Sequence, residues 1–198
     1  MITALLLSAC GVPSNTRRPA AVTPSPTPAA TISPESEPPS TPRPDEAHSE
    51  TEGKFEGTAG VTDKESRHPG VAVLSAVRAG AHDSFDRIVF EFSESGLPGF
   101  HVEYVDEPVR SCGSGEIVPL AGDAWLEIRM TPAAAHTHQG KPTINRSAFS
   151  PNLPIVRDLR STCDFEADVT WVAGVVSPNK YRVLELQDPA RLVIDISH

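Results

Sequence analysis

The prolines divide the chain into two parts with different capacities to fold. Eleven of the 20 prolines lie between residues 11 and 69, where they alternate with Ser, Thr, Ala and Glu. Such a segment cannot bury enough apolar surface to offset the entropy lost on ordering, so we expect residues 11–69 to be a disordered linker. Residues 70–198 hold nearly all the aromatic residues and the β-branched runs, and we expect one folded domain there.

Charge and apolar patterning exclude two large classes of protein. The chain has 17 basic and 26 acidic residues, a net charge of -9, and no basic patch that could release counterions from nucleic acid. No stretch approaches the roughly 18 consecutive apolar residues that span a bilayer. We therefore expect neither a nucleic-acid-binding protein nor a multi-span membrane protein.

The first ten residues resemble the lipobox of bacterial lipoproteins. A short apolar run, residues 2–9, ends in Leu7-Ser8-Ala9-Cys10. The resemblance implies that residues 1–10 are a lipoprotein signal, that Cys10 receives a diacylglycerol, and that the protein is anchored on the extracytoplasmic face of the cell membrane. The run is short and lacks Lys or Arg, unlike a complete signal peptide, so we expect the natural start to lie upstream of Met1. The alternative is a cytosolic protein with a chance cysteine.

The cysteine count fits an exported protein. If Cys10 carries lipid, Cys112 and Cys163 remain as a pair within the domain. An oxidising compartment preserves disulfides, so we expect these two to be bonded, with two unpaired buried thiols as the alternative. Metal binding by the two cysteines is disfavoured because they lack the C-x-x-C spacing of zinc sites.

Short alternating runs broken by Gly, Pro and Asp predict an all-β fold beyond residue 69. In Arg87–Phe92, for example, three apolar residues fall on one face and Arg87, Val89 and Glu91 on the other. The pattern predicts a β-sandwich of about eight or nine short strands. The expected strands cover residues 71–78, 87–92, 100–105, 116–120, 125–130, 155–159, 169–176, 181–186 and 192–196.

Two of these strands share a pattern. Residues 86–93 and 190–197 both contain Arg, apolar, Val, apolar, acid, apolar and Ser in that order. The repeat predicts a sandwich with pseudo-twofold character, although so short a match can arise by chance. Each strand would present an Arg/acid pair on its outer face, and these pairs form a ladder of Arg87, Glu91, Arg191 and Asp195.

Three stretches of the folded part together form a recognisable pattern: residues 82–90 (HDSFDRIVF), residues 165–171 from Phe-Glu to Trp, and residues 186–195 (LQDPARLVID). They look like the AMIN-like domain of bacterial envelope lipoproteins, which is similar to the AMIN domain found beside N-acetylmuramoyl-L-alanine amidases. The resemblance covers about residues 70–198. It implies a β-sandwich that binds peptidoglycan or localises its carrier in the cell wall, without fixing the binding residues.

Candidate catalytic and metal-binding residues are few. Gly113–Gly115 lacks the length of a phosphate-binding loop and fits a turn. His136 and His138 could hold a metal on a strand, but no third ligand is evident, and a solvated loop is the simpler interpretation. Asp83 and Asp86 could act as an acid/base pair or bind a cation; more simply, Asp83 caps a turn and Asp86 pairs with a neighbouring Arg. We expect no enzyme, cofactor or metal.

Two hypotheses of function remain. In the first, Trp125 and Arg129 project from the outer face of a strand and form a platform for peptidoglycan sugars, although a loop or the second sheet could equally cover Trp125. Trp171 lies in a strand that is apolar on both faces, and we expect it in the core. In the second hypothesis, the Arg/acid ladder docks on an envelope enzyme or secretion component.

Overall fold

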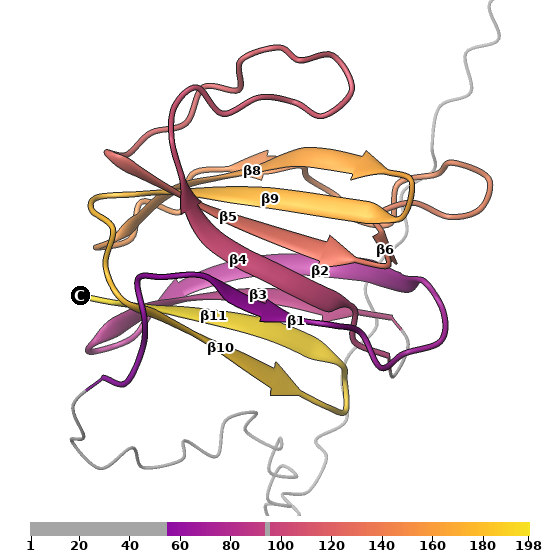
Figure 1. Cartoon of the computed structure of the whole chain (residues 1–198), viewed down its shortest axis with the longest axis horizontal. Helices are drawn as coiled ribbons and strands as arrows, with labels where there is room; N and C mark the ends of the chain where they lie inside the picture. The colour runs from indigo at the N-terminus through magenta and orange to yellow at the C-terminus, as the bar shows by residue number, and fades with distance from the viewer. Residues whose placement is uncertain (1–54, 94–95) are drawn as a thin grey trace, which may run out of the picture. The chain divides into compact units, whose positions relative to one another are not determined.

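The alternating runs fold into strands that pack as two curled sheets (Figure 1). This computed structural model describes residues 55–93 and 96–198, which contain eleven strands and no helix. The predicted β-sandwich is confirmed, and the strand count exceeds the expected eight or nine because three strands have only two or three residues. The lipidation site expected at Cys10 and linker residues 11–54 lie outside the described residues.

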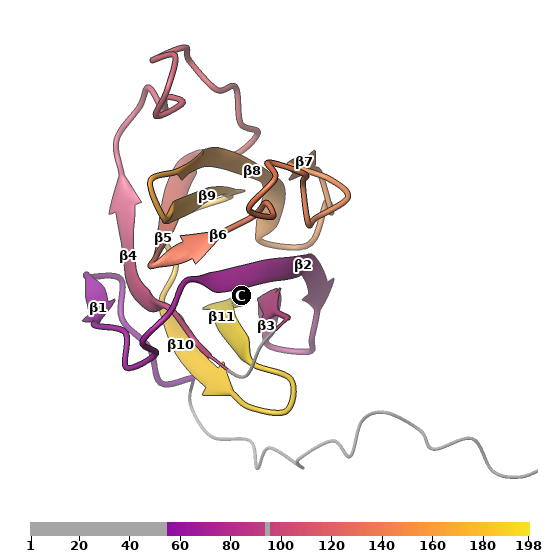
Figure 2. The ribbon, with the colours of Figure 1, turned by 90° about the vertical axis from the view of Figure 1, so that its right-hand side faces the viewer.

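One sheet has six strands in the order β1-β4-β5-β9-β8-β7, and the other has five in the order β10-β11-β3-β2-β6. Figure 2 shows β2, β3, β10 and β11 below β5, β8 and β9. All strand pairs are antiparallel except β2 with β6. The strands are β1 (Thr62–Lys64), β2 (Ala72–Ala81), β3 (Phe85–Phe92), β4 (Gly99–Val105), β5 (Ala124–Thr131), β6 (Ala133–Ala134), β7 (Ala148–Phe149), β8 (Val156–Phe165), β9 (Asp168–Val175), β10 (Tyr181–Leu186) and β11 (Arg191–Ser197).

The core lies between the sheets and follows the alternation of the sequence. In β3, Ile88, Phe90 and Phe92 are buried, whereas the residues between them are only half-buried. Trp171 on β9 is fully buried, as expected, and its ring meets those of Phe90 and Phe149 edge-on. Burying such large apolar side chains supplies most of the favourable free energy of folding.

The ordered domain includes residues that the sequence analysis assigns to the linker. Thr58 and Tyr181 exchange both backbone hydrogen bonds, at 2.9 and 2.8 Å, and β1 pairs with β4. The Tyr181 hydroxyl lies 2.6 Å from the Gly60 carbonyl oxygen and 2.7 Å from that of Val102. Because β1 has the polar sequence Thr-Asp-Lys, these tertiary contacts hold it in place rather than any strand pattern of its own.

A disulfide fixes the long loop between β4 and β5. Cys112 and Cys163 are bonded as predicted, and the Cys112 N–H donates to the Thr162 carbonyl at 2.9 Å. The strand predicted at residues 116–120 is wrong: this segment belongs to the loop and forms only an isolated bridge at Ile117. The loop passes so close to β9 that a Cβ at Gly174 would collide with the backbone carbonyl oxygen of Ala121.

Asp86 has different partners from those expected. It is fully buried, and its carboxylate accepts the N–H groups of Ile155 and Val156 at 2.6 and 2.8 Å and meets the His198 ring at 3.0 Å. The predicted pairing with a neighbouring arginine is therefore wrong. Asp86 faces inward, on the same side of β3 as Ile88, whereas the adjacent arginine faces outward.

Candidate functional site

The two strands with the shared sequence pattern are neighbours in the five-stranded sheet. β3 and β11 pair antiparallel, with Arg87 opposite Asp195. The Arg87 guanidinium donates two hydrogen bonds to the Asp195 carboxylate, at 2.7 and 2.9 Å, and Arg182 of β10 donates a third at 2.9 Å. Asp195 is fully buried although it lies on the outer face. This end of the predicted ladder thus holds three strands together.

The other end of the ladder is also paired inside the domain. Arg191 lies opposite Glu91, but the Glu91 carboxylate accepts a hydrogen bond from Arg78 of β2 at 2.6 Å. The Arg191 side chain contacts the Pro189 carbonyl oxygen at 3.3 Å. Three of the four ladder residues are thus held by ion pairs within the domain, whereas the Arg191 guanidinium contacts only a backbone carbonyl oxygen among the described residues.

The outer face of the six-stranded sheet is covered on one side and open on the other. The disulfide-bonded loop lies over β8 and β9, where the outward side chains of Thr170 and Val172 are buried. Over β4 and β5 the face opens into a hollow of about 570 Å³, which we name the groove. The groove is lined by Asp63, Lys64, Glu65, Ser66, Gly99, Phe100, His101, Glu103, Glu127, Arg129, Thr131 and Pro132.

Carboxylates and a histidine meet on the floor of the groove. Glu103 and Glu127 lie directly opposite each other on β4 and β5. Burial raises the pKa of Glu127, and the negative charge of Glu103 raises it further. The His101 ring lies 3.0 Å from the Asp63 carboxylate and 3.2 Å from that of Glu103. The hydrogen bond to Asp63 is the main reason that the pKa of His101 is raised, against the opposing effect of burial.

Arg129 forms one wall of the groove, and its side chain is fixed. Its guanidinium donates two hydrogen bonds to the Asp168 carboxylate of β9, at 2.8 and 2.5 Å, and the Thr131 hydroxyl donates a third to the same carboxylate. The hydrogen bonds from Arg129 lower the pKa of Asp168. The arginine that the sequence proposes as a contact is thus held in one orientation beside the carboxylates.

Trp125 faces outward, as its strand pattern predicts, and is half-buried. It lies opposite Val105 on β4 and opposite Gly174 on β9, where the loop crosses the sheet. On its own strand it shares the outer face with Glu127, two residues along. Trp125 is not among the residues that line the groove, but its place on β5 puts it next to Glu127 on the same face of the sheet.

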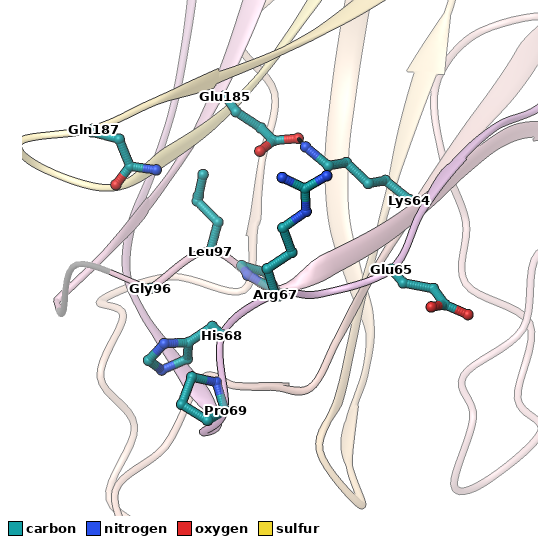
Figure 3. A pocket seen from close by; sticks show the side chains of 10 residues that line it. Lys64, Glu65, Arg67, His68, Pro69, Gly96, Leu97, Glu185 and Gln187 are labelled. Carbon is teal, nitrogen blue, oxygen red and sulfur yellow. Dashed lines mark hydrogen bonds and ion pairs between the residues drawn. The ribbon is translucent and has the colours of Figure 1, made fainter.

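A second hollow, of about 370 Å³, opens at the side of the sandwich near the edge strands β1 and β10; we name it the notch (Figure 3). Lys64 of β1 and Glu185 of β10 join the two sheets here through an ion pair of 2.5 Å. Gly96 packs so closely on the His68 ring that a Cβ would lie 2.2 Å from it. The notch is lined by Lys64, Glu65, Arg67, His68, Pro69, Gly96, Leu97, Pro98, Glu185 and Gln187.

Neither hollow could be expected from the sequence, because each is built partly from residues 63–69, which the proline-rich composition places in the linker. No group of three or more His, Cys, Asp or Glu residues in the described part of the chain is arranged to hold a metal ion. His136 instead forms a hydrogen bond with Asp164 at 2.8 Å.

Within residues 55–93 and 96–198, no helix is long and apolar enough to cross a membrane.

Comparison with known families accounts for most of the chain. The family model of the AMIN-like domain matches residues 72–198, from the start of β2 to the last residue. The chain belongs to the AMIN-like family. AMIN-like domains are non-catalytic binding and targeting domains with a general association with the cell wall or peptidoglycan. No curated protein and no solved structure matches the chain. The groove is lined by residues of β4 and β5, which lie in the matched region, and by residues 63–66, which lie before it.

Proposed function

We propose that the protein is a lipid-anchored, non-catalytic component of the cell envelope whose AMIN-like domain binds peptidoglycan in the groove. The observation that carries this proposal is the groove itself. Its volume of about 570 Å³ lies within the range of roughly 300–1,000 Å³ typical of ligand sites, and it occupies the uncovered part of a rigid sheet.

The chemistry of the groove suits a glycan with attached peptide. The carboxylates of Glu103 and Glu127 can accept hydrogen bonds from hydroxyl and amide groups, and Trp125 offers a flat apolar ring beside them. Because Arg129 and His101 are already held by carboxylates, little side-chain entropy is lost when a ligand binds. The polar residues of the groove are thus already held in place near an aromatic residue, which suits a site that binds a glycan without catalysing a reaction.

The lipid anchor rests on the sequence before the domain. Between Cys10 and Phe55 lie 44 residues, and the disordered linker that the sequence predicts would span roughly 33–40 Å on average at this length. This is enough to hold the AMIN-like domain away from the membrane and toward the wall. Intact mass of the membrane-extracted protein tests the anchor: we expect an N-terminus at Cys10 with added acyl mass, and an unacylated chain from Met1 would refute it.

Retention on purified sacculi tests the groove. We expect the full chain to be retained at about 0.5 M salt, where exposed ion pairs are screened. Trp125→Ala and Glu127→Gln should each reduce retention several-fold. Ile117→Ala is the matched control, because Ile117 is an exposed apolar residue on the loop outside the groove. Retention of both the Trp125 and the Glu127 variants at the level of the native chain would refute this site.

A further inference from the structure

We propose that the free edge of β10, together with the notch, binds a short extended segment of another protein that carries an acidic side chain. The notch shares Lys64 and Glu65 with the groove, but Arg67 and β10 lie outside the groove, and the inference does not depend on peptidoglycan binding. Three features carry it: unpaired backbone groups on β10, the direction in which a docked strand would point its side chains, and the charge inside the notch.

The hydrogen-bonding pattern of β10 leaves four backbone groups facing outward. Ser197 donates its N–H to the Lys180 carbonyl, whereas Tyr181 directs its N–H and C=O away from β11 and toward Thr58. Bonding direction alternates along an antiparallel strand, so Val183 and Glu185 also direct their N–H and C=O groups to the free edge. No described residue pairs with these four groups. Such an edge is a template onto which an extended segment can add as a further strand.

A strand added at this edge would send alternate side chains into the notch. Residues directly opposite in an antiparallel pair project to the same side of the sheet. Val183 packs against the core, and the Glu185 side chain reaches Lys64 of the other sheet, so both point inward. The docked residues opposite them would therefore also point inward, where the notch provides about 370 Å³ of space.

The notch is lined by two cations, Lys64 and Arg67, and by two carboxylates, Glu65 and Glu185, and Figure 3 shows the Glu65 side chain directed away from Arg67. Lys64 and Glu185 satisfy each other through their ion pair. Arg67 is exposed and has no hydrogen-bond or ion-pair partner among the described residues, and Figure 3 shows its guanidinium directed toward that pair. A carboxylate entering the notch could accept hydrogen bonds from this guanidinium, the geometry in which arginine binds most strongly. The occupant is therefore expected to carry Asp or Glu.

A second copy of the chain fits this edge less well than an acidic partner. Pairing β10 with another β10 would bring only the second copy's Glu185, which is already neutralised by its own lysine. Arg67 would remain without an acceptor. The open part of the edge is also short, because Thr58 covers its beginning at Tyr181. These features favour a short segment of a different protein.

The test uses the full chain with its disulfide formed, labelled with ¹⁵N, and a capped pentapeptide Thr-Val-Glu-Val-Thr as the probe. We expect the peptide to shift the amide signals of Val183 and Glu185. Replacing the peptide's Glu with Lys, or N-methylating its backbone, should weaken binding about tenfold or more, since each removes one of the proposed recognition elements. Equal binding of all three peptides would overturn the proposal.

Charge reversal on the protein provides the matched comparison. Arg67→Glu should weaken binding of the acidic peptide about tenfold, whereas Lys141→Glu makes the same charge change at an exposed residue outside the notch and should have no effect. Retention of Arg67→Glu on sacculi should match that of the native chain. If Arg67→Glu lost its retention on sacculi, the notch would belong to the peptidoglycan site. If the amide signals of Val183 and Glu185 disappeared when the protein concentration was raised without any peptide, the edge would bind a second copy of the chain. Either result would overturn the proposal.

Discussion

Replacing Asp86 with alanine tests the buried contact that joins β3 to the segment before β8. The Asp86 carboxylate accepts the backbone N–H groups of Ile155 and Val156, and all three residues are buried. A buried donor left without an acceptor costs roughly 1–3 kcal/mol, so Asp86→Ala should reduce the free energy of unfolding by about 4 kcal/mol. That is a large fraction of the stability of a typical domain, which is roughly 5–15 kcal/mol.

Two further variants separate the hydrogen bonds from the charge. Asp86→Asn keeps an oxygen that can accept both N–H groups but loses the charge assistance, so we expect a smaller loss of about 2 kcal/mol. Asp83→Ala removes an exposed carboxylate in the preceding turn and should change stability by less than about 0.5 kcal/mol. Urea unfolding followed by tryptophan fluorescence measures all three. If Asp86→Ala lost less than about 1 kcal/mol, the reasoning from the two buried donors would be refuted.

Two other measurements address the loop and the groove. Replacing Cys112 and Cys163 with serine opens a loop with a sequence separation of 51 residues and should lower the free energy of unfolding by about 4 kcal/mol in urea titrations; an unchanged unfolding midpoint would contradict this. Burial and Glu103 raise the pKa of Glu127 above its ordinary value of 4.5, so its contribution to stability is lost as the pH rises through the folded-state pKa. The Glu127→Gln variant has no carboxyl group to ionise, so its free energy of unfolding should rise relative to that of the native chain as the pH increases from about 4 to about 7. A difference in free energy of unfolding that stayed constant across this range would refute the raised pKa.

The sequence predicts strands well where apolar residues alternate, and less well where tertiary contacts decide. β3, β4 and β5 lie close to their predicted positions because each buries one apolar face. Residues 116–120 (EIVPL) are also rich in apolar residues, but a disulfide and a crossing over Gly174 hold them in a loop. β1 was missed for the opposite reason: its polar residues form a strand only because β4 offers an edge.

Only some features of the candidate site could be predicted from local sequence patterns. Outward projection of Trp125 and Arg129 follows from the alternation of β5 and could be predicted. The meeting of His101 with Asp63, and of Glu103 with Glu127, depends on strand order and register, which no local pattern specifies. The outer-face position of Asp195 was correct, but its complete burial depends on arginines from two neighbouring strands.

The place where the chain enters the sandwich determines how the domain would respond to mechanical load. A pull through the residues that precede Phe55 reaches the domain first at the Thr58–Tyr181 bridge and next at β1, which has only three residues. Peeling β1 away would separate Asp63 from His101 and Lys64 from Glu185. Both hollows would lose a wall while the other ten strands stayed paired, so tension along the chain would weaken ligand binding before it unfolded the domain.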